Sequence, residues 1–191
     1  MVAMSILRTI SENEATGDIA AIYAEDVADL GYVPSHTKVM ALNAEAYRAF
    51  EALARSIAKP LGLRRYELVT LAAAEAIGSS ACRFAHARKS LKIMAPDEVL
   101  RVISDYRTAG LSTAEVAMMD FAAALSRDSS AMTSEDSQQL RDLGFTDRDI
   151  LDIALAAGLR NFFSRTLHAL AVEVDVPPGL TIELREALGA P

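Results

Sequence analysis

The sequence predicts an all-α protein. Apolar residues recur at helical spacing through most of the 191 residues, whereas the alternating pattern that is typical of strands is scarce. Glycine and proline stand at the ends of these periodic segments, where they mark helix boundaries. About half of the residues are hydrophobic (51%), which is typical of a chain with a packed core. The length suits one domain, and we take residues 1–191 as a single domain.

The first half of the chain predicts four helices, over residues 15–31, 44–60, 64–77 and 80–94. The first segment ends on Gly31, and glycine is the preferred residue just past a helix end. The second is expected to stop before Pro60, because proline lacks an N–H group and clashes with the preceding turn. Gly78 and the two serines after it separate the third helix from the fourth.

The second half predicts further helical segments, over residues 95–110, 112–127, 133–144 and 146–159, the last of which leads into 160–175, with a short tail helix after Pro177 and Pro178. Pro96 in a first turn and Gly110 at the end follow the usual start and stop asymmetry of a helix. Ser112 and Glu115 are placed as a capping box.

Residues 64–94 and 146–176 form a weak internal repeat with an offset of 82 residues. The matched pairs are Glu67 with Asp149, Ser79 with Asn161, Cys82 with Ser164, Arg83 with Arg165 and His86 with His168. The repeat predicts two similar helical hairpins packed around an internal pseudo-twofold axis, with a thiol in the first copy only. The alternative is that two Ala/Leu-rich helix pairs look alike by composition, and that Asp149 caps a helix while Asn161 and His168 pack.

Charge and hydropathy exclude several classes of protein. The net charge of −7 argues against a nucleic-acid partner, and the basic clusters at 62–67 and 82–92 are short. No apolar run is long enough to span a membrane, and the N-terminal segment lacks the apolar core of a signal peptide. A single cysteine cannot form an internal disulfide, which fits a reducing compartment. We therefore expect a cytoplasmic protein without a membrane partner.

Cys82, the only cysteine, is the main candidate for chemistry. In one straight helix Glu67 and Cys82 would lie about 22 Å apart along the axis. The break at Gly78 instead predicts that a new helix starts at Ser79 or Ser80, with Cys82 in its first turn. The unpaired N–H groups and the dipole of a helix start favour the thiolate, which is the reactive form.

His86 follows Cys82 by four residues and shares its helix face, so it can act as a base or proton relay. If the chain doubles back at Gly78, Glu67 can orient His86, although the acid could also come from another subunit. Arg83 and Arg88 would add positive charge if they turn toward the thiol. A lone cysteine is also often an inert buried residue, and His86 can be structural. Cys82 and His86 are too few ligands for zinc, so we expect no metal and no cofactor.

The register of Glu67, position 79, Cys82 and His86 resembles the alkylhydroperoxidase (AhpD)-like / carboxymuconolactone decarboxylase superfamily, in particular its peroxidase-related branch. In peroxidase members an acid precedes a Cys-x-x-Cys pair by twelve residues, and a histidine follows the second cysteine by four. Residues 14–47 and 143–175 are also similar to the terminal regions of that branch, including Asn161, Phe162 and Arg165. The resemblance implies an AhpD-like helical bundle and a homo-oligomer, often a trimer or hexamer.

The sequence departs from the family at one cysteine. Ser79 stands where the partner cysteine would be, and Ala81 where a second histidine often lies. Ser79 cannot resolve a sulfenic acid, so an external thiol or a second chain would have to do so. Ser79 is instead expected to cap the helix or to donate a hydrogen bond to the thiolate.

Three functions remain open at this stage. The first is an antioxidant peroxidase that reduces a small hydroperoxide with Cys82 as nucleophile, His86 as base or relay, Glu67 as orienting acid and an external thiol as reductant. The second is a decarboxylase-like enzyme that acts on a small lactone or acid by acid–base chemistry at His86 and Glu67. The third is a non-catalytic oligomeric relative.

Overall fold

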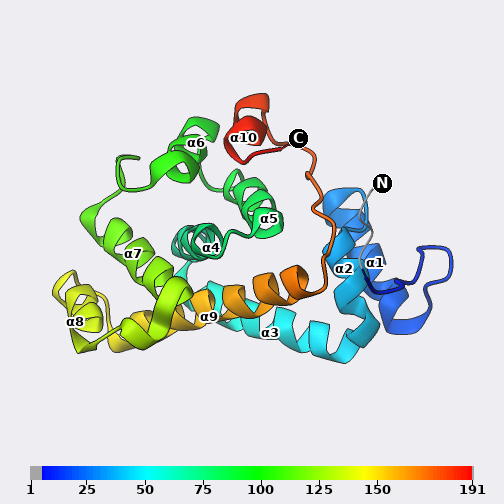
Figure 1. Ribbon diagram of the computed structural model, residues 1–191, viewed down its shortest axis with the longest axis horizontal. Coiled ribbons are helices and arrows are strands. Elements are labelled where there is room, and N and C mark those ends of the chain that lie inside the picture. Colours follow the sequence, from blue (N-terminus) through cyan, green and yellow to red (C-terminus); the bar gives the residue numbers. More distant parts are fainter. Residues whose placement is uncertain (1–5, 191) are drawn as a thin grey trace.

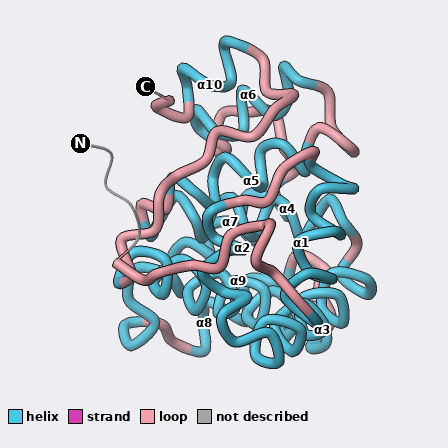
Figure 2. Tube along the Cα trace, turned by 90° about the vertical axis from the view of Figure 1, so that its right-hand side faces the viewer, coloured by secondary structure: helices cyan, strands magenta, loops and turns pink. Residues whose placement is uncertain are grey.

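The computed structural model describes residues 6–190 and forms a helical bundle, which confirms the predicted fold class (Figure 1). Its helices are α1 (Gly17–Leu30), α2 (Ser35–Met40), α3 (Ala44–Leu61), α4 (Leu63–Ile77), α5 (Ser80–Ser90), α6 (Pro96–Asp105), α7 (Thr113–Asp128), α8 (Ser134–Asp142), α9 (Asp147–Ala169) and α10 (Ile182–Ala187). No strand occurs within the described range (Figure 2). Residues 1–5, the start of the segment judged to lack a signal peptide, lie outside it.

Helix α4 occupies the centre of the bundle and is packed by α3, α5, α7 and α9 (Figure 1). Every residue from 66 to 74 is buried, including the charged Glu67. A helix that is buried on all sides must be apolar or small around its whole circumference, and the Ala-rich segment 72–74 meets that demand. Glu67 is the exception, so its charge needs a partner inside the protein.

The predicted break between α4 and α5 is present. Gly78 has a left-handed φ of 75°, and the N–H of Ser79 bonds the carbonyl of Ala74, which closes the end of α4. Ser79 is the N-cap residue of α5, so Cys82 lies in the first turn of that helix as expected. The turn lets α5 fold back beside α4.

The second segment of the predicted repeat does not form a hairpin. In place of the expected second hairpin, α9 is one continuous helix of 23 residues. At the offset of 82, the position that corresponds to the left-handed Gly78 is Arg160, which favours the helix interior. Cys82 and Ser164, which the repeat pairs, are in direct contact. The two copies therefore meet at the matched positions, although only one contains a turn.

Several helix ends differ from expectation. Helix α3 continues through Pro60 to Leu61, because the loss of one hydrogen bond is tolerated in a last turn that Gly62 closes on Ala58. Helix α5 ends at Ser90 and α6 at Asp105, several residues before the predicted ends. Helix α2 was not predicted. The capping box of Ser112 and Glu115 is confirmed.

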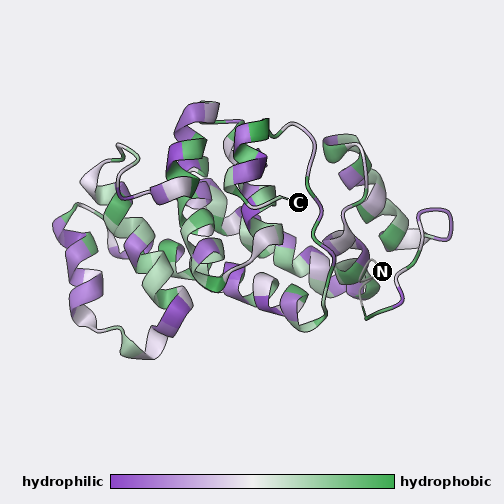
Figure 3. Ribbon diagram, turned by 45° about the horizontal axis from the view of Figure 1, so that its top comes forward, coloured by the Kyte–Doolittle hydropathy of each residue, from purple (hydrophilic) through white to green (hydrophobic). Residues whose placement is uncertain are grey.

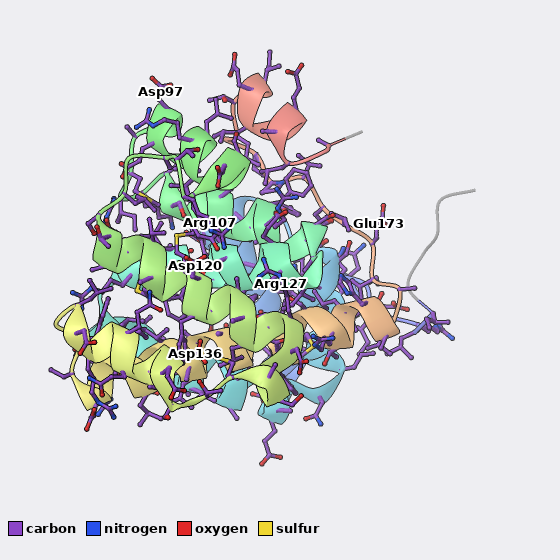
Figure 4. The ribbon with its side chains drawn as sticks, turned by 60° about the vertical axis from the view of Figure 1, so that its left-hand side comes forward. Asp97, Arg107, Asp120, Arg127, Asp136 and Glu173 are labelled. Atoms are coloured by element: carbon purple, nitrogen blue, oxygen red, sulfur yellow. The ribbon has the colours of Figure 1, made fainter. Side chains whose placement is uncertain are left out.

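Surface contacts also join neighbouring elements. Arg107, which follows α6, forms an ion pair with Asp120 of α7, and the hydroxyl of Tyr106 donates to the same carboxylate at 2.7 Å (Figure 4). Asp149 caps α9 together with Thr146, as the alternative interpretation of that residue proposed. These contacts lie outside the site described below.

Apolar and polar residues are not fully segregated on the outer helices (Figure 3). Leu53 of α3 and Leu155 and Phe162 of α9 are 45%, 41% and 53% exposed, and they belong to one apolar groove. Of the helices within residues 6–190, none is both long and apolar enough to cross a membrane.

Candidate active site

Cys82 lies in the first turn of α5 with its side chain turned into the protein, where only 2% of the residue is exposed. Two side chains of α9 donate hydrogen bonds to its sulfur. Arg160 Nη1 lies 3.2 Å from Sγ, and Ser164 Oγ lies 3.1 Å from it. Arg160 and Ser164 are four residues apart, so they project from one face of α9. The sulfur therefore has two donors and one full positive charge beside it.

These contacts decide the ionisation of the thiol. Burial raises the pKa of Cys82, but the charge of Arg160 and hydrogen bonds from Ser164 and Arg160 outweigh burial, and the pKa falls below its usual value. The hydroxyl of Ser79 also favours the thiolate, although Ser79 Oγ forms no hydrogen bond of full geometry with any residue in the described part. A lowered pKa enlarges the fraction of reactive thiolate at neutral pH.

His86 lies one turn after Cys82, and side chains of α4 bind its imidazole ring. Its Nδ1 lies 2.7 Å from Glu67 Oε2 and 3.2 Å from Thr70 Oγ1. The Thr70 hydroxyl in turn contacts the carbonyls of Tyr66 and Glu67. Both Glu67 and His86 are buried, at 5% and 2% exposure. The acid thus comes from the same chain, across the turn at Gly78.

The protonation state of this pair follows from its surroundings. Burial, together with the charge of Arg160, lowers the pKa of His86 to about 4 against the opposing effect of Glu67. Burial raises the pKa of Glu67, but the contact with His86 outweighs burial and lowers it. Because both pKa values are lowered, Glu67 is a carboxylate and His86 is a neutral imidazole at neutral pH. The imidazole proton then lies on Nδ1 and points to Glu67, which leaves Nε2 as a proton acceptor.

Cys82, His86 and Arg160 line one cavity of about 220 Å³. Its wall also contains the aromatic rings of His36, Tyr47, Phe50, Tyr66 and Phe163. His36 and Phe163 meet edge to face, with their ring centroids 5.6 Å apart, and Arg160 lies over the Phe163 ring at 5.5 Å. The space is large enough for a small organic molecule beside the sulfur.

Solved structures of other proteins share this arrangement of helices. The AhpD core of an uncharacterized peroxidase-related protein from Ralstonia eutropha JMP134 matches with a TM-score of 0.80 and 23% identity, over 92% of this chain and 94% of that one. An uncharacterized peroxidase-related protein from Silicibacter sp. TM1040 matches with a TM-score of 0.78 and 26% identity, over 94% and 96% of the two chains. The chain has the AhpD-like fold. The family resemblance expected from the sequence is thereby confirmed.

A further structural neighbour is the debrominase Bmp8. A cysteine-to-alanine variant of it, in complex with 2,3,4-tribromopyrrole, matches with a TM-score of 0.76 and 17% identity, over 96% of this chain and 97% of that one. No family model matches the sequence. No curated protein matches it either.

The structure brings all four predicted site residues of this AhpD-like chain close together, and two of them, Cys82 and His86, line the cavity. Ser79, Cys82 and His86 come from the start of α5, and Glu67 comes from α4. Ser79 does not cap the helix with its side chain, contrary to one expectation. Its hydroxyl is buried, and it is one of the groups that lower the pKa of Cys82.

The expectation that Arg83 and Arg88 supply the positive charge is wrong. Arg83 pairs with Glu75 at 2.6 Å, and Arg88 bonds to backbone carbonyls of Asp29 and Pro178. Neither arginine lines the Cys82 cavity. Both are on α5 but project from faces other than the one that carries Cys82 and His86.

Sequence reasoning missed Arg160 altogether, and it did not assign Ser164 a part in the site. A signal for both exists in α9, where the buried stripe of Ile153, Ala156 and Ala157 continues through Arg160 and Ser164. A charged residue on an otherwise apolar helix face needs a buried partner, and Cys82 is that partner. No group of three or more His, Cys, Asp or Glu side chains that could hold a metal occurs in residues 6–190.

Proposed function

We propose that the protein is a single-cysteine enzyme that reduces a small hydroperoxide at the expense of an external thiol. The observation that carries the proposal is the convergence on one cavity of a thiol with two donors on its sulfur and a histidine held by a buried carboxylate. This constellation supplies a nucleophile, a charge that stabilises it and a proton relay. An inert buried cysteine would need none of these.

The first step transfers one oxygen atom to sulfur. His86 Nε2 takes the proton of the Cys82 thiol, and Glu67 stabilises the imidazolium that forms. The thiolate attacks the terminal oxygen of ROOH, so that an S–O bond forms, the O–O bond breaks and RO⁻ leaves. The leaving alkoxide takes the proton from His86. The products are ROH and Cys82 sulfenic acid, with sulfur oxidised and the peroxide reduced by two electrons.

The second step restores the thiol. Ser79 cannot form a disulfide, so the sulfenic acid condenses with an external thiol R′SH, with release of water and formation of a mixed disulfide. A second R′SH attacks the mixed disulfide and releases R′SSR′. The Cys82 thiol is then regenerated, and two equivalents of external thiol have supplied the two electrons.

The test measures hydroperoxide consumption with tert-butyl hydroperoxide and excess dithiothreitol, with mass spectrometry of Cys82 after dimedone trapping. We expect sulfenic acid at Cys82 in the absence of thiol and loss of turnover in Cys82→Ala. Glu67→Gln should lower turnover by about 100-fold, the usual contribution of acid–base catalysis. Glu75→Gln is the matched control, because Glu75 lies on the same helix but pairs with Arg83 outside the Cys82 cavity.

Two results would contradict the proposal. One is an unmodified Cys82 with a Cys82→Ala variant that behaves like the original protein. The other is activity on a lactone that survives Cys82→Ala but not His86→Ala, which would favour the decarboxylase-like alternative. Absence of turnover with either substrate class, together with an ordinary thiol, would favour a non-catalytic relative.

Reductive dehalogenation is a second candidate, supported by the likeness to the debrominase Bmp8 over nearly the whole of both chains. The aromatic wall of the cavity suits a flat ring. Here the thiolate would take bromine from carbon, the carbanion would take a proton, and an external thiol would release bromide and form a disulfide with Cys82. Bromide release from 2,3,4-tribromopyrrole in the presence of dithiothreitol, absent in Cys82→Ala, separates this activity from peroxide reduction.

A further inference from the structure

Lys89 lines the same cavity as Cys82 and His86, and the chemistry above does not use it. The three residues lie on α5 at positions i, i+4 and i+7, which form one stripe along a helix. Side chains on a helix lean toward its N-terminus, so the Lys89 stem leans back toward His86 and Cys82. Lys89 also lines the neighbouring pocket, whose wall includes Asp26, Asp29 and Asp175, so this residue stands between the two spaces.

The Lys89 ammonium has no hydrogen bond or ion pair with any residue in the described part of the chain. The next lysine, Lys92, differs in this respect, because its Nζ lies 3.1 Å from Asp29. Glu67, the carboxylate with the largest influence on Lys89, is already bound by His86 at 2.7 Å. Lys89 is thus a cation of the cavity without a protein partner.

The other charges of the cavity do not supply that partner. Glu51 is paired with Arg48 at 3.1 Å, and Arg160 is engaged by the Cys82 sulfur. Arg55 adds a further cation at the exposed rim, and His36 has a pKa lowered to about 3 by burial, so it is neutral. The substrate space therefore has more cationic than anionic groups that are still free to bind.

The Lys89 ammonium is open to a ligand, because Lys89 is an exposed residue. Partial burial and the charge of Arg160 lower its pKa. An anion in the cavity would form a charge-assisted contact with Lys89 and favour its charged form. The arrangement therefore favours a ligand that brings its own negative charge.

The other residues of the cavity wall restrict the size and the chemistry of that ligand. Phe50, Ala54, Phe163 and Leu167 provide apolar surface, and the volume of about 220 Å³ admits only a small molecule. A single ammonium suits the one negative charge of a carboxylate better than the two of a phosphate. A short aliphatic or aromatic acid matches both the apolar wall and the unpaired ammonium of Lys89.

We propose that Lys89 is the anion-binding residue of the Cys82 cavity and that the natural substrate is a small organic acid whose carboxylate pairs with it. The proposal deepens the proposed function, on which it rests for the identity of the reacting end: a hydroperoxide group held at the sulfur while the acid group is held at Lys89. Lys89 is then a specificity-determining residue of the site.

The test uses two alkylating reagents of nearly equal size and the same leaving group, iodoacetate and iodoacetamide. Their rates of reaction with Cys82 are measured on the full chain by mass spectrometry at low salt. The ratio of the two rates cancels the reactivity of the thiol, and a free cysteine peptide gives the reference ratio. We expect the ratio for the protein to exceed the reference, because Lys89 attracts the carboxylate of iodoacetate.

Three variants locate the effect. Lys89→Gln should lower the ratio by about tenfold, the loss expected for one charge-assisted contact, and any change in the reactivity of the thiol itself cancels in the ratio. Lys89→Arg keeps the charge and should retain the preference. Lys92→Gln is the matched control, because Lys92 is a neighbouring lysine that does not line the cavity, and it should leave the ratio unchanged.

A binding experiment tests the proposal if neither reagent reaches the Cys82 thiol. Benzoate and benzamide differ only in charge, and benzoate alone should raise the melting temperature of the original protein but not that of Lys89→Gln. The proposal is overturned if the ratio equals the reference, if Lys89→Gln slows both reagents equally, or if benzoate and benzamide act alike on an unreactive protein. Since no arm uses peroxide, a carboxylate preference without peroxide turnover would leave this proposal standing and reject the proposed function.

Discussion

At the scale of single residues, the state of Cys82 depends on a balance between burial and the two donors of α9. Burial favours the neutral thiol, whereas Arg160 favours the thiolate through its charge and its hydrogen bond at 3.2 Å. Ser164 adds a second donor at 3.1 Å. Cys82 also lies in the first turn of α5, where the helix dipole favours the thiolate.

Replacement of Arg160 tests this balance. Arg160→Gln removes the largest effect that opposes burial, so the pKa of Cys82 should rise, and alkylation by iodoacetamide at pH 7 should slow about tenfold for each unit of that rise. The measurement is the pH dependence of the alkylation rate. Arg165→Gln is the control, because Arg165 lies on the same helix but bonds Asn161 and the carbonyl of Ser126. Identical pH profiles for both variants would show that Arg160 does not set the pKa of the thiol.

At the scale of helices, the turn at Gly78 creates the site. It ends α4, starts α5 and brings His86 within 2.7 Å of Glu67, nineteen residues earlier in the chain. The left-handed φ of 75° at Gly78 is a conformation that residues with a Cβ rarely adopt. In α9 the matched position is Arg160, so the helix continues without a turn. Its side chains Arg160 and Ser164 contact Cys82 of α5.

Two glycine substitutions with opposite expected effects on the free energy of unfolding test this interpretation. Gly78→Ala should destabilise the protein by about 1 kcal/mol, because alanine is strained at a left-handed φ. Gly158→Ala should stabilise it by up to about 1 kcal/mol, because alanine is the better helix former and the added Cβ meets no atom within 4 Å. Urea denaturation of both variants measures the free energy of unfolding. Equal shifts in the same direction would contradict the role assigned to Gly78.

At the scale of the whole molecule, two neutral histidines, the buried His86 and the half-buried His36, make the fold sensitive to acid. Burial lowers the pKa of His36 to about 3 and that of His86 to about 4. In the unfolded chain both would titrate near 6.5. Between about pH 6.5 and 4 the unfolded state therefore binds more protons than the folded state, and stability falls as the pH falls.

We expect the free energy of unfolding to drop by about 1.4 kcal/mol per pH unit for each of these histidines across that window. Urea midpoints at pH 7, 6 and 5 measure the slope. His36→Gln should reduce the slope, because one of the two titrating groups is removed. A stability that stays constant from pH 7 to 5, or an unchanged slope in the variant, would contradict this account.

The exposed apolar groove between α3 and α9 leads to an expectation of self-association. Leu53, Leu155 and Phe162 contribute to it, and its volume is about 440 Å³. Exposed apolar surface of this kind is usually covered by a partner, and the sequence predicted a homo-oligomer. Leu155→Glu should lower the molar mass measured by light scattering on a size-exclusion column. Ile182→Glu, an equally apolar site 70% exposed on α10, should not. A monomeric original protein would contradict the expectation.

The sequence by itself determined the helical class, the break at Gly78, the first-turn position of Cys82 and the grouping of Cys82 with His86 and Glu67. These depend on local periodicity, on glycine and proline and on a register of a few residues, all of which are encoded over short distances along the chain. Only the tertiary structure showed that Arg160 and Ser164 hold the thiol, that Arg83 and Arg88 do not, and that Lys89 stands unpaired in the cavity. Such facts depend on which helix faces meet across 78 or 82 residues. Contacts over that separation are decided by packing, because the spacing of residues along one helix carries no information about the helix that lies against it.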